Sequence, residues 1–163
     1  MATGMTDLLR VRLLIIFFGV ALVISGVTAF PLESELGVLK CLFEGKSGWL
    51  VSDVGEWISK VHEGLSETNN KYPFIAYGTD WLGFAHLVIA VAFIGPFRDP
   101  IKNVWVIEFG MLACCLVVPF ALVAGQFRGI PLGWRLIDCS FGIFGIIPLW
   151  YCRKLIGKMD KSA

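Results

Sequence analysis

Charged side chains are scarce in this sequence. Asp, Glu, Lys and Arg make up 17% of its 163 residues, whereas a soluble domain carries about 25%. The formal net charge is +1, so the chain has no global field that would attract nucleic acid. The scarcity argues against an ordinary soluble domain, and the length predicts one domain, residues 1–163.

Cysteine and histidine occur without the spacing of a metal site or a disulfide framework. No CxxC is present, and no Cys and His spacing resembles a zinc site. The five cysteines are Cys41, Cys114, Cys115, Cys139 and Cys152. With only His62 and His86, a bis-histidine haem would need His62 to reach a buried partner. We therefore expect no metal and no cofactor, and thiols that act as small apolar groups.

Catalytic and nucleotide-binding motifs are missing too. The sequence contains no P-loop, no HExxH, no GxSxG, and no GxGxxG that follows a strand. The interrupted helices and repeated halves of many transporters are also absent. The sequence therefore offers no confident catalytic residue and favours a non-enzymatic protein.

Long apolar runs are what the sequence has instead. Four of them occur, at residues 11–30, 81–97, 103–125 and 134–152. A hydrocarbon core of about 30 Å needs roughly 20 apolar helical residues. The sequence therefore predicts an all-α integral membrane protein, an antiparallel four-helix transmembrane bundle. The short loops predict that the second and third helices form a hairpin, and the third and fourth another.

The first apolar run follows Arg10 and Arg12, as the core of a signal peptide follows basic residues. Its length, from Leu13 to Phe30, exceeds the roughly 7–15 residues of a cleaved signal core. We therefore expect a retained signal anchor that forms the first membrane helix.

Small residues mark the faces that should meet, because helix association in lipid depends on close contact. In the four runs they are Ala21, Ser25 and Ala29; Gly83 and Ala90, with His86; Ala121 and Gly125; and Gly142 and Gly145, between Asp138 and Leu149. These stripes are the predicted packing faces of the bundle.

The basic residues predict the orientation of the helices. Eight of the 14 lie at the N-terminus, between the second and third runs, and in the C-terminal tail. Residues 31–80 carry four Lys and eight acidic residues, a net of 4 − 8 = −4. We therefore expect both termini in the cytoplasm and residues 31–80 outside. The compact loops favour a bacterial inner membrane.

Residues 31–80 carry two amphipathic helical patterns. Leu32, Leu36, Leu39 and Phe43 form one apolar stripe, and a second helix fits residues 52–67. Two such helices in the first extracytoplasmic loop must cover their apolar faces. Three alternatives stay open: a cap that packs on itself and the bundle, embedding in the bilayer interface, and a docking surface for another protein.

Ionisable residues inside the apolar runs are candidates for function, because they are costly in a membrane. His86 and Asp138 lie at similar depth from the outer side, and Arg135 precedes Asp138 by three residues. Glu108 enters from the opposite side, where its side chain would either extend to the aqueous interface or pair with Lys102 or a tail lysine. The predicted ligand-binding site comprises His86, Arg135 and Asp138, with Asp80, Arg128, Trp81 and Trp134 at its rim.

A structural interpretation of the same residues also stays open. Arg135 would then form a salt bridge with Asp138 on one helix face. Trp81 and Trp134 would be interfacial anchors. His86 would donate a hydrogen bond to a backbone carbonyl or to Ser140.

Two function hypotheses follow. The first is a non-enzymatic membrane protein that binds a partner subunit, a second copy, a lipid or a small ligand through its outer face. The second is a small membrane enzyme or proton-coupled carrier that uses His86, Asp138 and Arg135. A connected cavity that holds all three residues would favour the second, and a bundle without a void would favour the first.

Overall fold

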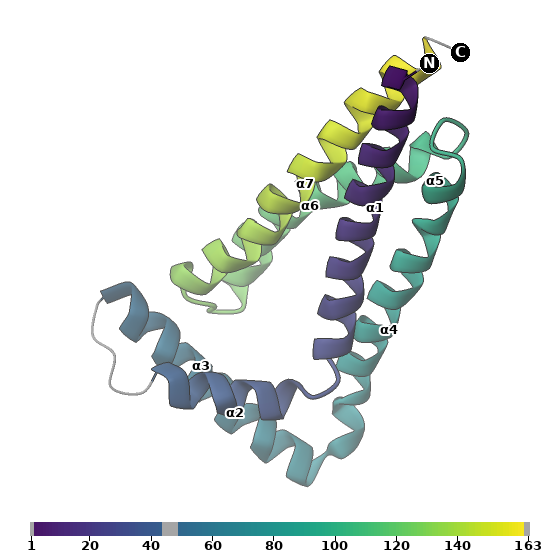
Figure 1. Cartoon of the computed structure of the whole chain (residues 1–163). Helices are drawn as coiled ribbons and strands as arrows, with labels where there is room; N and C mark the ends of the chain where they lie inside the picture. Colours follow the sequence, from purple (N-terminus) through teal and green to yellow (C-terminus); the bar gives the residue numbers. More distant parts are fainter. Residues whose placement is uncertain (1, 44–48, 162–163) are drawn as a thin grey trace.

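The computed structural model describes residues 2–43 and 49–161 (Figure 1). All regular elements within these ranges are helical. They are α1 (Ala2–Thr28), α2 (Leu32–Phe43), α3 (Trp49–Lys71), the short 3-10 helix η1 (Pro73–Ile75), α4 (Tyr77–Ala92), α5 (Ile94–Arg98), α6 (Val104–Phe127) and α7 (Leu132–Asp160). The all-helical prediction is confirmed.

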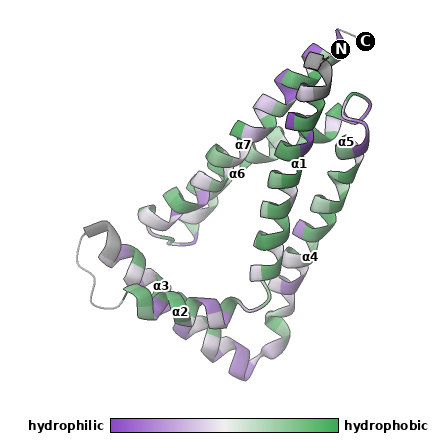
Figure 2. Ribbon diagram, viewed as in Figure 1, coloured by the Kyte–Doolittle hydropathy of each residue, from purple (hydrophilic) through white to green (hydrophobic). Residues whose placement is uncertain are grey.

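Four segments are long and apolar enough to cross a membrane. They are Thr6–Thr28, Pro73–Arg98, Val104–Phe127 and Leu132–Asp160. Large apolar side chains cover their outer surfaces, such as Phe120 at 73% and Phe144 at 70% exposed. Hydrophobic residues follow these helices along most of their length, whereas α2 and α3 are mixed (Figure 2). These features fit a multi-pass helical membrane protein.

The long helices pack in the order α4, α1, α7, α6, each against the next. The predicted hairpin of the third and fourth runs is present as α6 and α7. The predicted hairpin of the second and third runs is not, because α4 does not pack along α6, and Phe93 and the short α5 contact α6 instead. Figure 1 shows two pairs, α1 with α4 and α6 with α7, that meet near the termini and diverge towards α2 and α3.

The connection between α4 and α6 explains why those two helices stay apart. Asn103 Nδ2 donates hydrogen bonds to the backbone oxygens of Gly95 (3.2 Å) and Asp99 (3.0 Å). Arg12 Nε donates to Phe97 O at 3.2 Å, which ties α1 to α5. The loop thus contains a short helix that is held by the loop's own hydrogen bonds and by α1. This helix keeps α4 and α6 apart, so the two do not form a hairpin.

Glycine sets the crossing of α1 and α4. A Cβ atom added to Gly26 would lie 2.8 Å from Gly83 O, and one added to Gly83 would lie 2.6 Å from Gly26 O. Side-chain carbons do not approach a backbone oxygen so closely, so both positions require glycine. Gly83 belongs to a predicted packing stripe, whereas Gly26 lies next to the predicted Ser25.

The contact between α6 and α7 uses small residues in the same way. A Cβ atom at Gly142 would collide with the backbone oxygen of Cys114. One at Gly110 would lie 2.9 Å from Cδ1 of Leu149, a residue that is buried. The predicted stripe through Gly142 to Leu149 is therefore the face that meets α6.

The cysteines are free thiols. Cys114, Cys139 and Cys152 are buried, whereas Cys41 and Cys115 are exposed. The buried three lie within the helix contacts of α6 and α7, where a thiol packs as a small apolar group.

The hairpin of α2 and α3 lies across the end of the molecule opposite the termini (Figure 1). Leu36, Val54 and Ile58 form its buried core, and Trp134 of α7 packs against that core. Of the three alternatives for this segment, the contacts are those of a cap that packs on itself and on the long helices. The second helix runs from Trp49 to Lys71 and is longer than the predicted 52–67.

Replacing Gly26 by leucine should weaken the contact of α1 with α4, because the new side chain meets Gly83 O and Cβ of His86 at 3.1 Å. Overpacking of a close contact costs about 1–3 kcal/mol. The free energy of unfolding, measured by SDS titration in detergent micelles, should fall by this amount in Gly26→Leu. The matched control is Gly19→Leu on the same helix, where no atom lies within 4 Å of an added Cβ. An equal fall in the free energy of unfolding for Gly26→Leu and Gly19→Leu would contradict a close contact of α1 with α4 at Gly26.

Candidate functional site

A cavity of about 390 Å³ lies between the two helix pairs and is lined by residues of all four long helices. Its walls are mostly apolar and aromatic. The polar side chains among them are those of Ser25 and His86, with the thiol of Cys114. No Lys, Arg, Asp or Glu of the described chain lines it. The volume falls in the range of about 300–1,000 Å³ that is typical of ligand pockets.

Aromatic side chains close one end of the cavity. Phe93 is buried, and its ring centroid lies 4.9 Å from that of Phe18 on α1. Phe93 Cζ also lies 3.1 Å from the position of a Cβ added to Gly110, so the ring fills the space above α6. Phe93 follows His86 by seven residues, about 10 Å along a helix. The cavity therefore has a polar group, His86, in its wall and aromatic side chains at the end formed by Phe93 and Phe18.

The hydrogen bond of His86 fixes which ring nitrogen carries a proton. Nδ1 lies 2.8 Å from the backbone oxygen of Leu82. A carbonyl oxygen only accepts, so Nδ1 is the donor, and in the neutral ring Nε2 has a lone pair and no proton. The backbone bond expected from the structural interpretation is present. It leaves Nε2 as an acceptor that bonds to no residue the structure describes.

Arg135 and Asp138 do not line the cavity of His86. The aliphatic part of Arg135 lies on Gly125, and its Nη1 donates to Leu122 O at 3.3 Å. Asp138 is partly buried and makes no hydrogen bond or ion pair with any described residue. The salt bridge expected between the two is absent, because Arg135 turns towards α6. The predicted site residues are thus separated into different environments.

The four predicted rim residues also have different roles, and none lines the cavity. Trp81 is exposed and packs edge-on against two aromatic neighbours. Trp134 packs against the core of the hairpin instead. Asp80 lies in the first turn of α4, and Arg128 is exposed at the end of α6. Trp134 is therefore a packing residue that joins α7 to the hairpin.

An ion pair that the sequence did not predict joins α6 to α7. Arg153 Nε donates to Oε1 of Glu108 at 2.7 Å. The expected partner Lys102 pairs with Asp99 instead, at 3.5 Å. Arg153 follows the fourth apolar run, which ends at residue 152, but α7 continues to Asp160. The longer helix brings this arginine beside α6, where the ion pair stays exposed.

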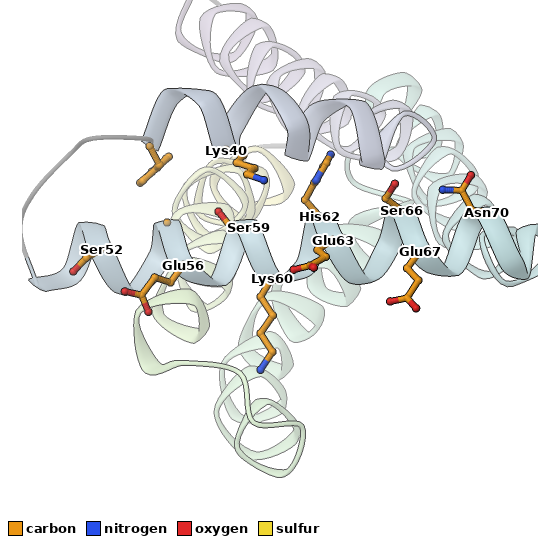
Figure 3. A pocket seen from close by; sticks show the side chains of 12 residues that line it. Lys40, Ser52, Glu56, Ser59, Lys60, His62, Glu63, Ser66, Glu67 and Asn70 are labelled. Carbon is orange, nitrogen blue, oxygen red and sulfur yellow. The ribbon is translucent and has the colours of Figure 1, made fainter.

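A second, broader hollow of about 1030 Å³ lies along the α2–α3 hairpin. Figure 3 shows Ser59, His62 and Ser66 pointing from α3 towards α2. Lysines and glutamates both line it, so it favours neither sign of ligand charge. Within the part of the chain that the structure describes, no three His, Cys, Asp or Glu residues are grouped to hold a metal ion.

No family model, curated protein or solved structure matches this chain. The cavity between the helix pairs is the better candidate site, because four helices contribute to it and His86 brings an unused acceptor to its wall.

A carboxylate of α2 accepts a hydrogen bond from α3. Asn69 Nδ2 of α3 donates to Oε2 of Glu33 on α2 at 2.7 Å. This bond, with a second from Ser66, lowers the pKa of Glu33 below its ordinary 4.5. A carboxylate that accepts hydrogen bonds is favoured over its protonated form.

The lowered pKa predicts that the hairpin loosens in acid. A group whose pKa falls on folding stabilises the fold above its unfolded-state pKa, and this contribution is lost as the pH falls through the folded-state value. Amide protection factors of α2, which correct for the intrinsic exchange rate, should therefore drop once the pH is below 4.5. Glu33→Gln should remove the drop, and Glu35→Gln on the same helix should keep it. If the amide protection of α2 still falls below pH 4.5 in Glu33→Gln, protonation of Glu33 is not the cause.

Proposed function

We propose that this chain is an integral membrane protein that binds a lipid-like ligand in the cavity between its two helix pairs. Its four spans run in alternating directions, with both termini in the cytoplasm and the α2–α3 hairpin outside. A bacterial inner membrane is the proposed location. The protein is a binding protein in this proposal and not an enzyme.

The distribution of charge supports this orientation. The termini and the α5 turn lie at one end, where Arg12 bonds to Phe97 O and Arg153 pairs with Glu108. The hairpin at the other end belongs to the segment with a net charge of −4, from four Lys and eight acidic residues. Basic segments remain on the cytoplasmic side during insertion.

The observation that carries the proposal is the cavity itself. It is bounded by α1, α4, α6 and α7, while α4 and α6 do not pack together. In a bilayer, the side between α4 and α6 faces hydrocarbon, so the cavity takes up molecules dissolved in the membrane in preference to polar metabolites. An apolar cavity of about 150 Å³ already binds benzene, and this one holds about 390 Å³.

The alternative of an enzyme or proton-coupled carrier has less support. That hypothesis needs His86, Asp138 and Arg135 in one connected cavity, and only His86 lines it. One imidazole among apolar side chains suits recognition of a ligand better than proton transfer between two groups.

A photoreactive lipid tests the proposal. The protein is reconstituted in dioleoylphosphatidylcholine vesicles with hexadecanol that carries a mid-chain diazirine, and the cross-linked residues are mapped by mass spectrometry. We expect cross-links on the cavity faces of all four long helices. Ala113→Phe fills part of the cavity from α6 and should reduce these cross-links at least threefold.

The matched control is Ala92→Phe. Both alanines are exposed and lie on long helices, but Ala92 does not line the cavity. This variant should label like the native protein. Labelling spread evenly over every lipid-facing surface, with no difference between the two variants, would contradict a binding cavity.

A further inference from the structure

The walls of the cavity limit the charge of its ligand. No Lys, Arg, Asp or Glu of the described chain lines it, and an ionised group without a partner is costly to bury in apolar surroundings. The nearest basic groups towards the termini, Arg12 and Arg153, already bond to Phe97 O and Glu108. A phosphate headgroup would therefore have no countercharge in the cavity, and a neutral ligand fits.

Two polar side chains line the cavity near the crossing of α1 and α4. Ser25 of α1 directly precedes Gly26, and a Cβ atom added to Gly26 would lie 3.1 Å from Cβ of His86 on α4. Ser25 and His86 thus flank the same crossing, and both line the cavity. No hydrogen bond joins Ser25 Oγ to His86 or to any other residue that the structure describes.

The two groups have complementary hydrogen-bonding capacities. In the neutral imidazole whose Nδ1 donates to Leu82 O, Nε2 can only accept. The Ser25 hydroxyl can donate as well as accept. A ligand group that donates a hydrogen bond to His86 Nε2 and accepts a hydrogen bond from the Ser25 hydroxyl would satisfy both side chains. A hydroxyl group can do both. A carbonyl or an ether oxygen offers no proton to His86.

We infer that the ligand is a neutral membrane lipid with a free hydroxyl group, which donates to His86 Nε2 and accepts from Ser25 Oγ. Its apolar chain extends along the aromatic wall towards Phe93, which directly follows α4 and lies about 10 Å from the level of His86. This inference rests on the proposed binding function and specifies the headgroup that the cavity selects.

Competition between two matched lipids tests the inference. Unlabelled hexadecanol and hexadecyl methyl ether have the same chain, but only the alcohol donates a hydrogen bond. Each is titrated against the diazirine-bearing hexadecanol in vesicles of the full-length native protein. A net hydrogen bond contributes enough to make the alcohol compete at about three- to tenfold lower concentration.

Variants of His86 connect this preference to its ring. His86→Phe keeps an aromatic ring without an acceptor, so the alcohol and the ether should compete equally. His86→Gln restores an acceptor oxygen and should recover part of the preference. Ser25→Ala should weaken binding of the alcohol less than His86→Phe does, because Ser25 meets only the ligand's acceptor side.

Nitrogen NMR reads the tautomer directly. In His62→Gln protein labelled with ¹⁵N-histidine, the only imidazole is that of His86. We expect a protonated Nδ1 and an unprotonated Nε2, and a shift of the Nε2 resonance on addition of hexadecanol but not of the ether. A protonated Nε2 would overturn the inference.

The outcomes separate the two proposals. Equal competition by alcohol and ether in the native protein would overturn the hydroxyl inference and leave the binding cavity standing. If neither lipid displaces the probe, the proposed function fails and the inference fails with it. A preference for the alcohol that persists in His86→Phe would also refute the inference, because a group other than His86 would then recognise the hydroxyl.

Discussion

The close approach of Gly26 and Gly83 is the contact on which the rest of the structure depends. Each glycine leaves room for the backbone oxygen of the other, so α4 lies directly on α1. In lipid, apolar side chains gain little from meeting one another, and close backbone contact decides which helices pair. Gly142 has the same role for α7 against α6. Two glycine contacts therefore divide four helices into two pairs.

The cavity is a consequence of this pairing. Because α4 is held by α1, and α6 by α7, the space between α4 and α6 has no helix to fill it. The pairs are joined by α1 packing against α7, and at one end by Phe93, which lies against Gly110 of α6. At the other end, Trp134 rests on the hairpin. His86 lies on α4, in the first pair, and its side chain lines the cavity between the two pairs.

Hydropathy and periodicity predicted the elements, because those signals depend on one segment at a time. The four apolar runs and the stripe from Leu32 to Phe43 correspond to helices, and His86 could be singled out as an ionisable group in an apolar run. The pairing of helices was not predictable in this way. A short loop suggested that α4 packs on α6, but the loop folds into α5 around Asn103. His86 and Asp138 do not share the cavity, because Asp138 does not line it.

The most direct test of this account is the accessibility of a spin label at Ala113, on the cavity wall of α6. Ala113→Cys is labelled in vesicles after the exposed thiols are removed by Cys41→Ser and Cys115→Ala. The account predicts relaxation of the label by oxygen, which dissolves in hydrocarbon, and none by a water-soluble nickel complex. A label shielded from both would mean a closed bundle, and a label relaxed by nickel would mean an aqueous channel; either result would contradict a cavity open to the membrane.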